Sequence, residues 1–152
     1  MKLNNSLPLR VACDGESSSG KSTAAKLISI KYKLFCMNSG LLFRYASRLI
    51  IKHKPKKNIP FLRQKFKNLN YKQVTFLNLH TQEISNHVAV LATQKKVRLI
   101  IRNFQKKIIR KHHRICCEGR EQASTILKKK PRYDIAFYFR CNLATASYRR
   151  WL

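Results

Sequence analysis

Gly15-Glu16-Ser17-Ser18-Ser19-Gly20-Lys21-Ser22 is the stretch that decides the fold of this chain. It matches the pattern G-x-x-x-x-G-K-[ST], in which a glycine-rich loop joins a strand to a helix. Residues 9–13 before it alternate and then run apolar, as a buried strand does, and residues 23–32 after it have apolar side chains at helical spacing. The stretch therefore has the context that a phosphate-binding loop requires.

The residue types in this loop suit the binding of phosphate. Gly15 lets the chain turn as it leaves the strand, and Gly20 lets the backbone approach a phosphate closely. The backbone N–H groups between them form a nest for an anion, which the first turn of the helix completes. Lys21 would reach the β- and γ-phosphates of a nucleotide, and the Ser22 hydroxyl would be a ligand of Mg²⁺. The alternative is a surface turn with an accidental Lys-Ser pair.

The charge of the chain is unusual, because 33 lysines and arginines stand against 6 acidic residues and give a formal net charge of +27. A field of this size attracts polyanions, so one interpretation is nucleic-acid binding. The other is a lysine-rich composition spread over solvated faces, and the occurrence of basic residues all along the chain favours it. We therefore expect RNA binding to be incidental.

At 152 residues the chain is long enough for one domain with its own core. Its five cysteines include no C-x-x-C pair, so the sequence has no zinc or redox motif. We expect them to be reduced core residues of a cytoplasmic protein. We expect neither a signal peptide nor a membrane span. The cysteines are Cys13, Cys36, Cys116, Cys117 and Cys141.

The order of elements predicts an α/β fold of the P-loop NTPase type, with a parallel sheet in a three-layer α/β/α arrangement. Strands are expected at 8–14 and 134–140, and the strand at 134–140 is expected to be buried. Short apolar runs also occur at 34–37 and 114–117. The stretch 53–60 is expected to be a loop, and 61–79 to hold a helix and a short strand at 73–79. The whole chain, 1–152, is predicted to be a single domain with an insertion outside the main sheet. The other expected helices are 20–33, 41–52, 83–92 with Thr81 as cap, 97–111, 122–129 and 143–152.

Four stretches match, in order and approximate spacing, the motifs of one family. Residues 14–23 (DGESSSGKST) resemble D-G-P-x-x-[SA]-G-K-[SG]-T, and residues 38–44 (NSGLLFR) resemble D-[ST]-G-x-x-Y-R. Residues 83–88 (EISNHV) with Val97-Arg98 resemble E-[VI]-[SA]-N-x-[VA] and V-R, and residues 118–121 (EGRE) resemble D-G-R-D. On these motifs the chain resembles the bacterial-type cytidylate kinases, which are P-loop nucleoside monophosphate kinases.

The resemblance implies a transferase of pyrimidine nucleotide metabolism that moves the γ-phosphate of ATP to CMP or dCMP, with Mg²⁺ as cofactor and a monomer as the active form. It implies that Lys21 and Arg120 are catalytic, that Ser22 binds the metal, and that residues of about 53–80 form the insertion that binds the monophosphate. The ATP-binding residues would be Gly15, Glu16, Ser17, Ser18, Ser19, Gly20, Lys21, Ser22 and Thr23. The substrate-binding residues would be Ser39, Arg44, Arg98, Arg120 and Glu121.

The chemistry of phosphoryl transfer is compatible with these roles, since it needs in-line placement and positive charge on the transferred oxygens more than covalent help. Arginine suits an acceptor phosphate because its fork binds two oxygens at once. Each residue also has another interpretation. Ser39 could be a helix N-cap, and Arg44 and Arg98 could be charges on solvated helix faces.

The chain departs from the family pattern at several positions. Glu16 replaces a proline, Asn38 an aspartate, and Ala89 a frequent serine, while Glu118 and Glu121 stand for the two aspartates of D-G-R-D. Family members continue with an arginine-rich lid, a last strand and a last helix, and residues 148–152 resemble only the start of the lid. We therefore expect weak transfer, or ATP hydrolysis, or no activity. The alternatives are a catalytically inactive P-loop domain, a basic RNA-associated protein, or another P-loop small-molecule kinase.

Overall fold

The computed structural model describes residues 7–151, which form two compact units. Residues 7–38 and 108–151 make the first unit, and residues 39–107 make the second. The insertion predicted at about 53–80 falls inside the second unit, and its role in binding a monophosphate stays a prediction.

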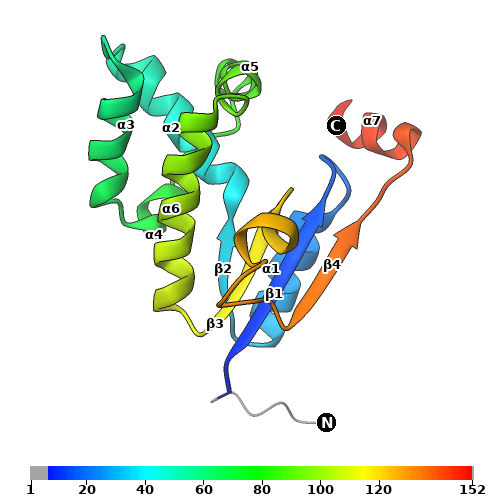
Figure 1. Cartoon of the computed structure of the whole chain (residues 1–152). Helices are drawn as coiled ribbons and strands as arrows, with labels where there is room; N and C mark the ends of the chain where they lie inside the picture. Colours follow the sequence, from blue (N-terminus) through cyan, green and yellow to red (C-terminus); the bar gives the residue numbers. More distant parts are fainter. Residues whose placement is uncertain (1–6, 152) are drawn as a thin grey trace. The chain divides into compact units, whose positions relative to one another are not determined.

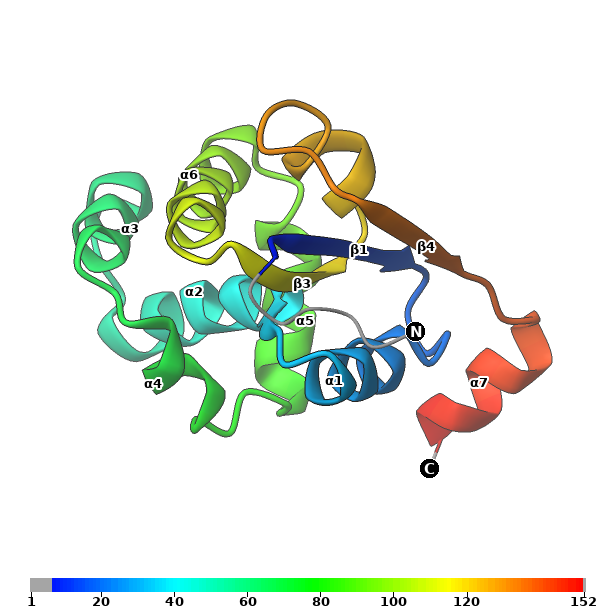
Figure 2. The ribbon, with the colours of Figure 1, turned by 90° about the horizontal axis from the view of Figure 1, so that it is seen from below.

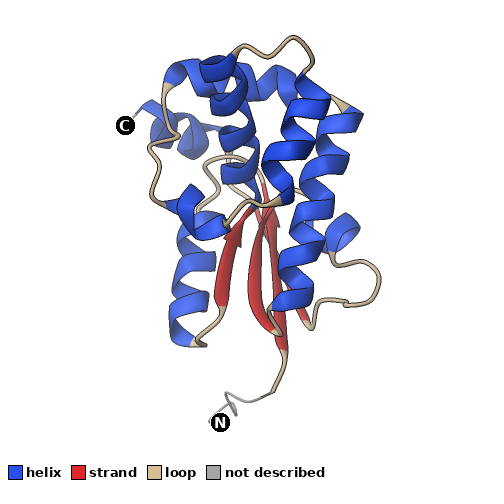
Figure 3. Ribbon diagram, turned by 90° about the vertical axis from the view of Figure 1, so that its left-hand side faces the viewer, coloured by secondary structure: helices blue, strands red, loops and turns tan. Residues whose placement is uncertain are grey.

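The first unit is built on a four-stranded parallel sheet with the strand order β2-β3-β1-β4 (Figure 1). Cys13 of β1 lies opposite Glu118 of β3 on one side and Phe137 of β4 on the other. Because every neighbouring pair is parallel, the carboxyl ends of the strands meet at one edge (Figure 3), which is where ligands bind in such sheets. The strands are β1 (Leu9–Gly15), β2 (Phe35–Asn38), β3 (Arg114–Gly119) and β4 (Ile135–Phe139).

Helices flank this sheet on both faces, which confirms the predicted α/β class. Helix α1 (Lys21–Lys31) covers one face, and the short π-helix η1 (Gln122–Ile126) lies against the other (Figure 2). Helix α7 (Leu143–Trp151) follows β4. Apolar burial between α1 and the sheet holds this unit together. Its core cluster consists of Val11, Cys13, Ala25, Leu34 and Cys116.

The second unit is helical, and α2 is the helix against which α3, α4 and α5 pack. A buried cluster of Val74, Leu79 and Ile84 forms its core, and aromatic rings of Tyr45 and Phe66 extend it with an edge contact at 6.0 Å between centroids. The helices are α2 (Ser39–His53), α3 (Asn58–Lys67), α4 (Tyr71–Thr75), α5 (Gln82–Leu91) and α6 (Lys95–Lys111), of which residues 95–107 belong to this unit.

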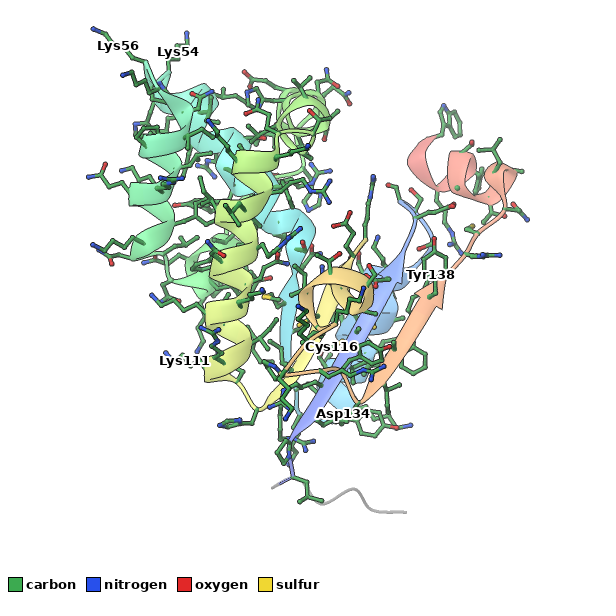
Figure 4. The ribbon with its side chains drawn as sticks, in the orientation of Figure 1. Lys54, Lys56, Lys111, Cys116, Asp134 and Tyr138 are labelled. Carbon is green, nitrogen blue, oxygen red and sulfur yellow. The ribbon has the colours of Figure 1, made fainter. Side chains whose placement is uncertain are left out.

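The prediction that residues 134–140 form a buried strand is wrong in its burial. Strand β4 exists, but residues 135–138 are exposed and only Phe139 is half-buried. Figure 4 labels Asp134, which precedes this strand, and Tyr138 within it. Among the described residues, β4 pairs with β1 alone and therefore lies at an edge of the sheet. Apolar and aromatic composition predicts an extended segment but not its neighbours.

The prediction for residues 53–79 is wrong in two places. The strand expected at 73–79 is replaced by helix α4, in which the Asn70 side chain accepts from the Lys72 N–H at 3.1 Å and caps the N-terminus. The loop expected at 53–60 is shorter, because α3 already begins at Asn58. Pro60 then falls in the first turn of a helix, where its missing N–H costs no hydrogen bond.

Two other predictions have clear outcomes. Thr81 caps α5, and its hydroxyl accepts from the Ile84 N–H at 3.3 Å, as expected. All five cysteines are free, but only three are buried, because Cys36 and Cys141 are partly exposed.

In residues 7–151 no helix combines the length and the apolar character needed to cross a membrane.

Candidate active site

The glycine-rich loop runs from the end of β1 to the start of α1. Gly15 has a φ of 154°, and a Cβ at this position would lie 2.3 Å from the carbonyl oxygen of Phe139. Gly15 is therefore required by the close approach of β4, a reason that the sequence does not show. Gly20 has a φ of 85° and is the N-cap of α1, and Ser18 is left-handed as well, at 62°.

The N-terminus of α1 is arranged as an anion site. Its cap is a glycine, so no side chain satisfies the first N–H groups of the helix, and no acidic residue stands in the first turn. These N–H groups and the helix dipole favour a bound phosphate. The carbonyl of Glu16 is engaged inside the loop, where it accepts from Ser19 Oγ at 2.9 Å and from Lys21 Nζ at 3.2 Å. Glu16 itself is exposed.

Glu118 at the end of β3 connects the two side chains on which the phosphate-loop prediction depends. Its carboxylate accepts a hydrogen bond from Ser22 Oγ at 2.7 Å and lies 3.7 Å from Lys21 Nζ. Glu118 is only 4 % exposed. Such burial of a carboxylate is tolerated because it is both hydrogen-bonded and close to an ammonium group. The structure thus joins the loop to the Glu-Gly-Arg-Glu stretch.

Two oxygen-bearing side chains, Ser22 and Glu118, lie together at the end of the loop, and their oxygens are suitable ligands for the magnesium ion expected from the sequence. The hydroxyl of Ser22 and the carboxylate of Glu118 are the oxygen types that Mg²⁺ accepts, and it commonly takes few protein ligands together with phosphate oxygens and water. In the part of the chain that is described, no larger cluster of His, Cys, Asp and Glu side chains forms a separate metal site.

Asp14 fixes the segment that follows β3. Its carboxylate is 6 % exposed and accepts from the backbone N–H groups of Gln122 at 2.6 Å and Ala123 at 2.9 Å. These bonds hold the first turn of η1 beside the end of β1. Arg120 and Glu121 stand in the short connection between β3 and η1, where Arg120 is exposed and Glu121 is the residue before the helix.

Arg149 adds a positive group from α7. Its Nη1 donates to the carbonyl oxygen of Ser18 at 3.1 Å, and it also approaches Cys141 Sγ at 3.9 Å. The guanidinium has five N–H donors. It therefore has the capacity to hold the loop backbone and an anion beside it together.

Two thiols on neighbouring strands, Cys13 of β1 and Cys116 of β3, contact each other behind the loop. Cys13 Sγ lies 3.7 Å from Cys116 Sγ, and this hydrogen bond together with burial raises the pKa of the Cys13 thiol far above its usual range. Burial likewise raises the pKa of Cys117. The same hydrogen bond acts in the opposite direction on Cys116 and lowers the pKa of its thiol.

The predicted acceptor-binding residues are divided between the units. Ser39 is the buried first residue of α2, and Arg98 is half-buried on α6. Arg44 does not lie on a solvated face, because its Nη1 donates to the Leu79 carbonyl and to Ser85 Oγ, both at 3.0 Å. These three residues belong to the second unit, whereas Arg120 and Glu121 belong to the first.

Sequence reasoning underestimated Asp14 and Arg149. Asp14 appeared there only as part of a motif and Arg149 only as the beginning of a lid, whereas Glu118 was expected near Ser22 at the carboxyl edge of the sheet, where it would order water bound to Mg²⁺. A signal was available for Asp14, since it is a carboxylate at the carboxyl end of a predicted parallel strand, where ligands gather. Nothing in the sequence pattern indicates that Arg149 reaches the loop.

In a comparison with protein families, a family model described as cytidylate kinase matches residues 11–151. The chain belongs to the cytidylate kinase family. The match includes the loop, Glu118 and the segment up to α7. It confirms the family resemblance that the four motifs predicted.

Curated relatives are distant and longer. The chain is 32% identical over 136 residues to a bifunctional pantoate ligase/cytidylate kinase of Prochlorococcus marinus (strain MIT 9312), covering 76% of this chain and 26% of the relative. It is 29% identical over 133 residues to a cytidylate kinase of Thermosipho melanesiensis, covering 80% of this chain and 59% of that protein. It is 26% identical over 154 residues to a cytidylate kinase of Mesomycoplasma hyopneumoniae (strain 7448), covering 93% of this chain and 66% of that protein. The chain therefore spans less than two thirds of each of these relatives.

Proposed function

We propose that this chain transfers the γ-phosphate of ATP to CMP or dCMP and so produces the diphosphate. The observation that carries the proposal is the group formed by Lys21, Ser22 and Glu118, in which an ammonium, a hydroxyl and a buried carboxylate meet at the end of the glycine-rich loop. Membership of the cytidylate kinase family supports the choice of acceptor.

Each residue of the loop would have a distinct task. The N–H groups at the start of α1 would hold the phosphates of ATP, and Lys21 would exchange its bond to the Glu16 carbonyl for one to a phosphate oxygen. Positive charge placed on the transferred oxygens is the main contribution that such a site makes to the rate. Arg149, already bound to the loop at Ser18, would add a second cation.

Ser22 and Glu118 would hold the magnesium ion that accompanies ATP, and this ion would neutralise charge between the β- and γ-phosphates. In the structure Glu118 already orients the Ser22 hydroxyl by accepting its hydrogen bond. Asp14 would act indirectly, because its bonds to Gln122 and Ala123 fix the connection that carries Arg120.

Arginines would bind the acceptor. Arg120 and Arg98 have the bidentate geometry that suits a phosphate monoester. The Nη1 of Arg44 already contacts Leu79 and Ser85, which would hold its guanidinium plane in a fixed orientation toward the acceptor. Ser39 would donate a hydrogen bond from the start of α2.

The direct test is ADP formation by the purified chain with Mg²⁺-ATP, with CMP, dCMP, UMP or AMP added in turn. We expect turnover that depends on CMP or dCMP and is abolished in Lys21→Ala. The matched control is Lys26→Ala, because Lys26 is an exposed lysine of the same helix, and it should retain the activity.

Two other results would contradict the proposal. Turnover with a different acceptor would place the chain among other P-loop kinases. An absence of turnover with every acceptor, together with ATP binding that Lys21→Ala weakens, would identify a catalytically inactive nucleotide-binding domain.

A further inference from the structure

A groove in the second unit has no part in the proposed kinase reaction. It has a volume of about 460 Å³ and is lined by residues from α2, the segment after α4 and the start of α5. Ile51, Leu77 and Ile84 give it an apolar lining. Its size lies in the range of about 300–1,000 Å³ that accommodates small molecules or single groups of a larger ligand.

Phe76 is the most exposed aromatic residue at this groove. It lines the groove and is 87 % exposed. It is not part of the apolar cluster around Val74 and Leu79, although its neighbour Leu77 is. A ring in this position offers a free face on which a flat, unstacked base can lie, and such stacking is tolerant of base identity.

Two cations stand beside the ring, because Arg48 and Lys52 also line the groove, one helical turn apart on α2. Lys54 and Lys56 follow Lys52 in the sequence and extend outward from the segment between α2 and α3 (Figure 4). Glu83 lines the groove too, and it is the only acidic residue between positions 39 and 107. A segment with many lysines and arginines and one carboxylate is complementary to a polyanion.

Hydrogen-bond donors complete the lining. The Oδ1 of Asn78 accepts from the His80 N–H at 3.3 Å, which leaves the amide NH₂ as the donating end. The Thr81 hydroxyl accepts from the Ile84 N–H at 3.3 Å and still has its own proton to donate. Such groups can bind a ribose 2′-hydroxyl, the group that distinguishes RNA from DNA.

We propose that this groove binds single-stranded RNA, with one base stacked on Phe76 and the adjoining phosphates paired with Arg48 and Lys52. The strand continues past Lys54 and Lys56, where phosphate contacts add affinity without sequence preference. Neither ATP nor the glycine-rich loop takes part, so this inference does not depend on the proposed kinase activity.

The test is the affinity of the full chain for a fluorescent single-stranded oligouridylate in the absence of ATP, measured by anisotropy at several salt concentrations. Phe76→Ala should weaken binding roughly tenfold, and Phe76→Trp should preserve it. Lys52→Gln and Arg48→Gln should each weaken binding and lower the salt slope by about 0.7. Glu83→Gln should strengthen binding, because it removes the carboxylate from the groove.

Matched controls separate the groove from the general positive charge. Lys72→Gln removes an exposed lysine of the same unit that does not line the groove, and Val90→Ala removes an exposed apolar side chain elsewhere. Both should bind the oligouridylate nearly as the parent does. Phe76→Ala should leave the affinity for heparin unchanged, because heparin has charge but no bases. Circular dichroism and thermal unfolding verify that every variant is folded.

The proposal is overturned if Phe76→Ala binds the RNA as tightly as the parent, or if Lys72→Gln weakens binding as much as Lys52→Gln. It is also overturned if single-stranded DNA binds equally well, which would remove the role of the 2′-hydroxyl. Binding of a polyglutamate peptide at similar affinity, with the same dependence on Phe76, would identify an acidic protein segment as the occupant instead.

Discussion

Gly15 occupies a position where any side chain would meet backbone. The φ of 154° and the 2.3 Å that would separate an alanine Cβ from the Phe139 carbonyl oxygen leave no room for a methyl group. We therefore expect Gly15→Ala to lower the free energy of unfolding by about 2 kcal/mol or more. Urea unfolding followed by circular dichroism measures this loss. Gly40→Ala, at an exposed glycine inside α2, is the control and should leave stability unchanged or slightly raised.

Cys117 makes stability depend on pH. Burial raises the pKa of its thiol in the folded state, whereas an unfolded thiol ionises near pH 8.5. Above that pH the unfolded state loses its proton and the folded state keeps it, so stability falls as pH rises. Each such thiol contributes a slope of up to about 1.4 kcal/mol per pH unit. The contribution is absent below the unfolded pKa.

Cys117→Ala should therefore unfold with a shallower pH dependence between about pH 8.5 and pH 10 than the parent chain. Urea midpoints measured across this interval test the prediction. An identical slope in Cys117→Ala would show that this thiol is not protected in the folded state.

At the scale of elements, the connection between β1 and η1 depends on a single carboxylate. Asp14→Asn keeps the shape of the side chain but replaces one acceptor oxygen by an NH₂ group, which would face the N–H of Gln122 or Ala123. We expect a loss of about 2–3 kcal/mol of stability, because a buried hydrogen bond to a charged group is removed. Amide hydrogen exchange at Gln122 and Ala123 should become faster.

The matched variant for this prediction is Asp134→Asn. Asp134 also accepts a backbone hydrogen bond, from the Arg10 N–H at 2.7 Å, but it is exposed. Water can replace that bond, so its loss should cost less than about 1 kcal/mol. If both variants lose the same stability, burial of the Asp14 carboxylate is not what makes the contact strong.

The elements that could be predicted from the sequence are those in which local pattern and tertiary context agree. The strand, loop and helix of residues 9–31 follow from one motif, and the Thr81 cap follows from residue type. The prediction of a strand at α4 was wrong because the apolar pattern around Val74 suits a strand as well as a helix. The hydrogen bond from the Asn70 side chain caps the helix and so favours the helical form. The π-helix η1 depends on Asp14, which is distant in sequence.

The candidate site likewise contains residues whose positions follow from local sequence and residues whose positions depend on the fold. The loop residues were predictable because their spacing is fixed by the phosphate that they would bind. The bonds from Lys21 and Ser22 to Glu118 were not, since they require the register between β1 and β3. The interior role of Arg44 also required the fold, because its partners Leu79 and Ser85 lie far along the chain.

At the scale of the whole molecule, the net charge of +27 should destabilise the folded state through self-repulsion. Raising NaCl from about 0.01 M to about 0.15 M shortens the Debye length from about 30 Å to about 8 Å and screens this repulsion. We expect the midpoint of thermal unfolding to rise by about 3 °C or more. Differential scanning calorimetry in sodium chloride measures the change.

The variant Lys21→Ala separates screening from anion binding at the loop. Screening acts on all charges, so this variant should show nearly the same rise in midpoint as the parent. A rise that disappears in Lys21→Ala would mean that chloride acts at the N-terminus of α1 and not through the general field.

Strand β4 has a consequence for how the protein behaves at high concentration. Its outer edge presents backbone groups without a partner strand in the described chain, and Ile135 and Phe137 beside them are 45 % and 43 % exposed. Open apolar edges of this kind template aggregation. Mutual repulsion between highly cationic molecules keeps two such edges apart, and added salt weakens that protection. Added salt should therefore stabilise each folded molecule and at the same time lower the protein concentration at which the molecules aggregate.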